Sequence, residues 1–63
     1  MLGQAKIQMM DVTGKWQTVS STLNSDQLVL LQLQSIQRTF KRNVRAIDDR
    51  GNLIQFYPYA GEK

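Results

Sequence analysis

Of the side chains that most often serve in catalysis or metal binding, the chain has five carboxylates but neither cysteine nor histidine. Without these two residue types there is no thiol nucleophile and no imidazole base that titrates near neutral pH. Zinc sites built from cysteine and histidine are excluded for the same reason. Sixty-three residues also leave little room for a pocket that could desolvate a substrate. We therefore predict that the protein is not an enzyme. The carboxylates are Asp11, Asp26, Asp48, Asp49 and Glu62.

Asp48 and Asp49 are adjacent, which could suggest a metal site. Calcium loops, however, present several oxygen ligands at regular spacing, and no third ligand follows this pair closely in the sequence. We interpret Asp49 as a solvated residue at the tip of a turn. The sequence predicts no metal and no cofactor.

A short pattern occurs twice: residues 10–16 read MDVTGKW and residues 47–53 read IDDRGNL. In both, an aspartate follows an apolar residue, and a glycine follows three positions later. Such an aspartate accepts hydrogen bonds from backbone amides further along the turn. The glycine can adopt the left-handed conformation that closes a three-residue hairpin loop with a bulge. We therefore predict that Asp11 and Asp48 form turns and are neither ligands nor catalytic groups.

The residues around these turns predict two β-hairpins, at about 5–21 and 44–57. Their strands are rich in β-branched and aromatic residues, and Pro58 should end the last one because it has no backbone donor. Residues 60–63 are expected to be a frayed tail.

The segment between the hairpins has no glycine or proline and predicts a helix over about 26–42. Asn24 together with Gln27, or Ser25 alone, could cap its start, and Asn43 could end it in a left-handed conformation. A 4-3-4 spacing predicts one apolar stripe, which should pack on the sheet rather than form a coiled coil. The stripe consists of Val29, Leu33, Ile36 and Phe40.

Together these elements predict one small α+β domain over residues 1–63, with the order ββαββ. We expect a four-stranded antiparallel sheet with one helix packed on one face. In the first hairpin the turn register places Met9 opposite Gln17 and Ile7 opposite Val19. The second turn sets three pairs, Ile47 with Leu53, Ala46 with Ile54, and Val44 with Phe56. The helix should then cover Val44, Ala46, Ile54 and Phe56.

One helix cannot cover both faces of a sheet, so the other face is a candidate for binding a protein partner or a second copy of the chain. Tryptophan, tyrosine, methionine and arginine are enriched at such interfaces. The alternative is that Trp16, near a turn, curls over the end of the sheet into the core. The predicted partner-binding residues are Met10, Trp16, Arg45, Ile47, Leu53 and Tyr57.

The chain has eight lysines and arginines against five acidic residues, and a net charge of +3. Clustered cations beside aromatic rings could bind single-stranded nucleic acid, which gives a second hypothesis. Equally, cations at a helix end complement its dipole, and the sequence lacks the signature of an RNA-recognition sheet. The candidate nucleic-acid residues are Lys6, Arg38, Lys41, Arg42 and Arg45, with Trp16 and Tyr57 as stacking groups.

The layout W-x-x-V-S at 16–20, then a helix, then R-x-V-R-A-I-D-x-x-G-x-L-I at 42–54, resembles small orphan proteins encoded by bacteriophages. The resemblance covers most of the chain but identifies no specific family. It implies an accessory factor that binds a host protein in the host cytoplasm, or one that binds DNA, and it implies no catalytic residues. A structural or assembly subunit of a virion is a third possibility. Without an apolar run long enough to span a bilayer or a signal peptide at residues 1–4, we expect a cytoplasmic protein with no membrane partner.

Overall fold

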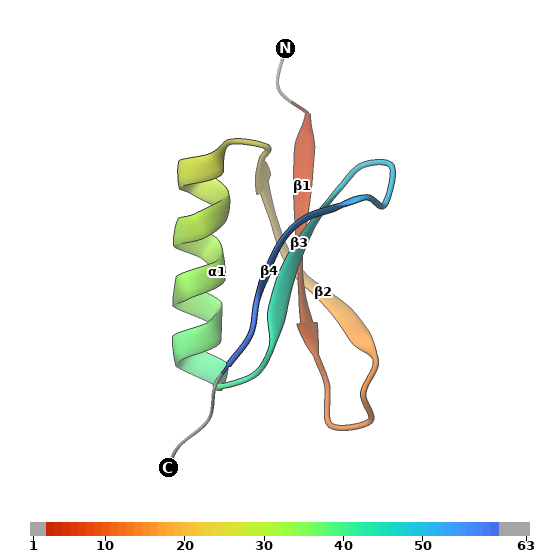
Figure 1. Cartoon of the computed structure of the whole chain (residues 1–63), viewed down its shortest axis with the longest axis vertical. Coiled ribbons are helices and arrows are strands. Elements are labelled where there is room, and N and C mark those ends of the chain that lie inside the picture. The colour runs from red at the N-terminus through yellow and green to blue at the C-terminus, as the bar shows by residue number, and fades with distance from the viewer. Residues whose placement is uncertain (1–2, 60–63) are drawn as a thin grey trace.

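The computed structural model describes residues 3–59. One helix lies along one face of a single sheet (Figure 1). The strand order is β2-β1-β3-β4 and all neighbouring strands are antiparallel, so the predicted ββαββ fold is confirmed. The predicted tail at 60–63 and the first two residues lie outside the described residues. The elements are β1 (Gln4–Met10), β2 (Trp16–Leu23), α1 (Asp26–Phe40), β3 (Val44–Asp48) and β4 (Leu53–Tyr57).

Both hairpin turns have the predicted geometry. In the first, the Oδ1 atom of Asp11 accepts hydrogen bonds from the N–H groups of Thr13 and Lys15, at 2.9 and 3.0 Å. In the second turn the Oδ1 atom of Asp48 accepts hydrogen bonds from the N–H groups of Arg50 and Asn52, at 2.9 and 2.8 Å. Gly14 and Gly51 both have φ of 87°, a conformation that an L side chain rarely adopts. The interpretation of the two aspartates as turn formers is confirmed.

The ends of α1 differ from the prediction. Ser25 is the N-cap residue, but its side chain makes no capping hydrogen bond. The helix ends at Phe40, and Lys41 rather than Asn43 takes the left-handed conformation, with φ of 57°. The side chain of Asn43 is used elsewhere, since its Oδ1 accepts a hydrogen bond from the backbone N–H of Tyr59 at 2.8 Å.

The core is a single small layer between α1 and the sheet. The helix contributes Val29 and Leu33, with Ile36 partly buried beside them. Phe40, predicted to complete this stripe, is 52% exposed because it lies at the last position of the helix. Small side chains on the two central strands allow the helix to approach the sheet closely. The fully buried residues are Ala5, Ile7, Val29, Leu33, Val44 and Ala46.

A β-bulge in β2 alters the predicted register of the first hairpin. Met9 lies opposite Gln17 as expected, but Ile7 lies opposite Ser20 and not Val19. Val19 is the extra residue of the bulge, so the prediction of an Ile7–Val19 pair is wrong. Ser20 therefore faces the helix, where its hydroxyl donates a hydrogen bond to the Oε1 atom of Gln32 at 3.3 Å.

A second bulge has the larger consequence, because it exchanges two aromatic residues between the faces of the sheet. Ile47 pairs with Leu53 as predicted, but Ala46 pairs with Gln55, which leaves Ile54 as the extra residue. Beyond it the alternation of faces is reversed. The three shifted pairs are Ala46 with Gln55, Arg45 with Phe56, and Val44 with Tyr57.

Candidate functional site

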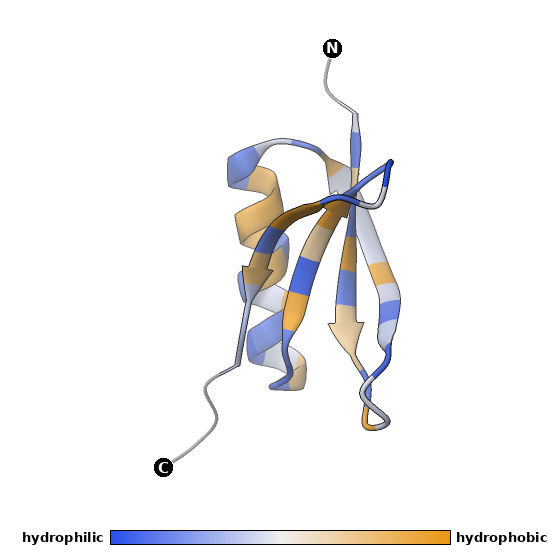
Figure 2. Cartoon of the chain, turned by 45° about the vertical axis from the view of Figure 1, so that its right-hand side comes forward, coloured by the Kyte–Doolittle hydropathy of each residue, from blue (hydrophilic) through white to orange (hydrophobic). Residues whose placement is uncertain are grey.

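The sheet face that α1 leaves uncovered, called the open face below, is built from four rows of side chains. Residues directly opposite each other on neighbouring strands share a face, and successive rows lie two residues apart along a strand, or three where a bulge intervenes. Figure 2 views the sheet with α1 behind it and shows apolar and polar segments alternating along the strands. The rows are Met10–Trp16, then Thr18–Gln8–Arg45–Phe56, then Ser21–Lys6–Ile47–Leu53, then Leu23–Gln4.

Arg45 lies at the centre of the open face and is held from two sides. Its guanidinium carbon lies 4.3 Å from the centre of the Trp16 ring, a cation–π contact. Its Nε–H donates to the Oε1 atom of Gln8 at 2.8 Å, and the amide of Gln8 donates to the hydroxyl of Thr18 at 3.2 Å. This chain of contacts joins β3 through β1 to β2, so it fixes the Arg45 side chain in one position.

The aromatic part of the open face reaches from one edge of the sheet to the other. Trp16 on β2 and Phe56 on β4 meet edge to face, with ring centres 6.2 Å apart and an angle of 81° between the rings. An aromatic pair with this geometry stabilises a folded protein by more than the burial of its apolar surface alone would. Trp16 is therefore held over Arg45 and Phe56, and it does not curl into the core, whose residues are all on the other face.

Much of this surface remains in contact with solvent. Leu53 is 58% exposed and Phe56 is 46% exposed. Trp16, Met10 and Ile47 are half-buried. Large apolar side chains grouped on one face in this way mark a surface that another molecule can cover.

Tyr57 is the one predicted partner-binding residue that the structure moves to the other face. It lies opposite Val44 and packs against the core under α1. The prediction that Tyr57 belongs to the uncovered face is therefore wrong, and Phe56, predicted to lie under the helix, takes its place. The sequence held no signal for this exchange, because the two residues are adjacent and both are aromatic.

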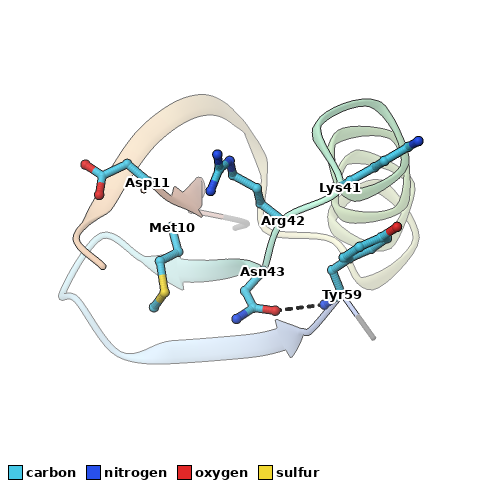
Figure 3. Close-up of a pocket in the computed structure, with 6 residues that line it drawn as sticks. All are labelled: Met10, Asp11, Lys41, Arg42, Asn43 and Tyr59. Atoms are coloured by element: carbon cyan, nitrogen blue, oxygen red, sulfur yellow. Dashed lines mark hydrogen bonds between the residues drawn. The ribbon is translucent and has the colours of Figure 1, made fainter. Parts of the chain in front are cut away.

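The predicted basic cluster is divided among different parts of the molecule. Arg38 borders a hollow on the side of α1 that faces away from the sheet, whereas Arg45 and Lys6 belong to the open face. Lys41 and Arg42 lie at the end of the molecule beside Met10, and their side chains diverge (Figure 3). A nucleic-acid backbone needs several cations within one continuous track. The five predicted cations do not form one.

Lys41 and Arg42 do line a hollow together, which has a volume of about 240 Å³. Figure 3 shows it between the first hairpin and the segment that follows α1, with Tyr59 bonded to Asn43 at its edge. Asp11 and the C-terminal end of the helix both add negative potential here, which offsets the attraction of the two cations for an anion. The hollow is therefore a poor anion site.

The carboxylates of both turns are occupied by hydrogen bonds. Hydrogen bonds from the Thr13 hydroxyl, the Lys15 N–H group and the Gln17 amide lower the pKa of Asp11 from 3.8 to about 2. The backbone N–H of Asn52 lowers the pKa of Asp48 in the same way. A carboxylate with a lowered pKa is a weak base, so neither aspartate suits acid–base catalysis.

The lowered pKa of Asp11 predicts acid sensitivity. The ionised Asp11 carboxylate stabilises the fold fully at a pH above the pKa that Asp11 has in the unfolded chain. This stabilisation is lost as the pH falls through the pKa that Asp11 has in the folded protein, between about pH 4 and pH 2. We expect the urea midpoint of the wild type to fall over this range. Asp11→Asn keeps an oxygen acceptor but no charge, so its midpoint should fall less steeply. If the urea midpoints of the two proteins fell equally with pH, Asp11 would not be the source of the acid sensitivity.

Within residues 3–59 no group of three or more acidic, histidine or cysteine side chains is placed to hold a metal ion. In the same part of the chain, the helix is too short and too polar to cross a bilayer. Comparisons of the chain with protein-family models, with curated proteins and with solved structures find no match.

Proposed function

We propose that the protein is a non-enzymatic interaction protein that binds a protein partner, or a second copy of itself, through the open face. The observation that carries the proposal is the exposed apolar surface around Trp16, organised on Arg45 and Phe56 rather than collapsed into the core. Tryptophan and arginine at the centre of a patch are the residue types that dominate binding energy at protein interfaces. A role as a phage accessory factor in the host cytoplasm is the form of this proposal that the resemblance implies.

Nucleic-acid binding is the weaker of the two hypotheses. Only Lys6 and Arg45 of the predicted cations belong to the open face, and Arg45 is already stacked on Trp16 and bonded to Gln8. Few phosphates could then be neutralised beside the aromatic rings.

The test is capture of partners from a lysate of the cells in which the protein occurs, with wild type compared with Trp16→Ala. The matched control is Leu31→Ala, which removes an exposed apolar side chain from the far side of α1. We expect the wild type and the control to retain a protein partner after nuclease treatment, and Trp16→Ala to lose it. Loss of the partner from the wild type on nuclease treatment would favour nucleic acid, and retention by Trp16→Ala would contradict the proposal.

A further inference from the structure

The charges of the open face indicate the chemistry of its partner. Across its four rows the described residues supply two cations, Lys6 and Arg45, and no carboxylate. The nearest carboxylates belong to the two turns: Asp11 and Asp48 accept hydrogen bonds from the backbone of their own turns, and Asp49 lies beside Gly3 at the far end of the face from Trp16. The remaining polar groups of the four rows are neutral. The strand residues of the face are therefore apolar, neutral or cationic, and the carboxylates lie only in the turns at its ends.

The guanidinium of Arg45 is ready to bind a carboxylate. Trp16 and Gln8 fix its position through the ring contact and the Nε–H bond, so little side-chain freedom remains to be lost on binding. Within residues 3–59 no bond joins its two terminal amino groups to another residue, and no buried polar atom lacks a partner. These amino groups consequently reach solvent, where a carboxylate can accept from both of them.

The same charges disfavour a second copy of the chain as the occupant. Two open faces packed about a twofold axis would gather Lys6 and Arg45 of both copies, four cations, in one interface. The described strand residues of the face include no carboxylate that could offset their repulsion.

We propose, on the basis of the proposed function, that the open face binds an acidic and apolar segment of another protein. In this arrangement a carboxylate of the partner pairs with Arg45, and apolar side chains beside it cover Phe56 and Leu53, which are exposed on β4. Lys6, next to Ile47 in the adjoining row, takes a second acidic group.

A displayed library of random peptides, selected on the immobilised protein, tests this inference. We expect the selected peptides to be enriched in both acidic and apolar residues, and the enrichment to disappear with Trp16→Ala. Selection on Arg45→Gln should retain the apolar enrichment and lose the acidic one. Arg38→Gln, a cation removed from the outer side of α1, is the control and should select the same peptides as the wild type.

Binding of one selected acidic peptide can then be followed by the fluorescence of Trp16, the only tryptophan of the chain. Arg45→Lys keeps the charge but not the paired donors, so we expect affinity to fall about tenfold. Peptides that are apolar without acidic enrichment would overturn the inference and leave the proposed function standing. If none of the enrichment depends on Trp16, both the inference and the proposed function are overturned. Tighter binding of random single-stranded oligonucleotides than of any peptide would also overturn both.

Discussion

Leu33→Ala is expected to destabilise the protein more than any other single truncation in α1. Leu33 is fully buried between the helix and the sheet, and its removal leaves a cavity in a core that, within residues 3–59, has six buried residues. Truncation of a buried leucine costs about 3 kcal/mol, whereas a domain of this size has a stability of about 5 kcal/mol. Urea unfolding followed by circular dichroism should show a midpoint at less than half of the wild-type urea concentration.

Leu31→Ala provides the matched control, because it makes the same chemical change two residues away on the same helix. Leu31 is 61% exposed, so its truncation should change the free energy of unfolding by about 0.5 kcal/mol or less. Similar losses for the two variants would show that α1 does not pack on the sheet through Leu33.

Phe56→Ala should weaken partner binding strongly while the fold remains intact. Phe56 meets Trp16 on the open face and is 46% exposed, so its ring is available to a partner. Truncation of an aromatic residue at the centre of an interface costs about 2 kcal/mol of binding energy, or roughly a thirtyfold loss of affinity. Titration of the partner recovered from the lysate would measure this loss.

Tyr57→Ala should have the opposite profile, because Tyr57 packs against the core on the other face. We expect the free energy of unfolding to fall by about 2 kcal/mol, while the affinity of the molecules that remain folded is unchanged. The two neighbours thus distinguish the observed register from the one that the sequence predicted. If instead Tyr57→Ala lowered the affinity and Phe56→Ala lowered the stability, the register predicted from the sequence would be correct and the observed one wrong.

The parts of the fold that local sequence determines could be predicted. Each hairpin turn depends on an aspartate and a glycine three residues apart, and their hydrogen bonds form within five residues. The position of α1 followed from the apolar spacing that contains Val29 and Leu33. In contrast, the end of the helix depends on Lys41 adopting a left-handed conformation that nothing in its own side chain favours.

The composition of the open face could be predicted only up to the bulges. The pairing of Ile47 with Leu53 follows from the second turn, and so it was predicted correctly. No glycine lies at Ile54 to indicate a bulge in the sequence. Because Phe56 and Tyr57 are adjacent aromatic residues, either register places one apolar ring on each face, and the hydrophobic pattern fits both.

The division of the basic residues also lay beyond the sequence. Arg38 and Arg45 are only seven positions apart, but the helix and the sheet lie between their side chains in the folded chain. Their proximity in the sequence therefore suggested a cluster that the packing of α1 does not create.

The central claim, that the open face is the binding surface, is tested most directly by backbone and side-chain NMR of the isotopically labelled protein. Spectra would be recorded with and without the unlabelled lysate of the cells in which the protein occurs. We predict that broadening and shifts are concentrated at the Trp16 indole, the Arg45 Nε–H group and the amides of Leu53 and Phe56. Perturbation confined to the outer side of α1, around Leu31, would contradict the claim.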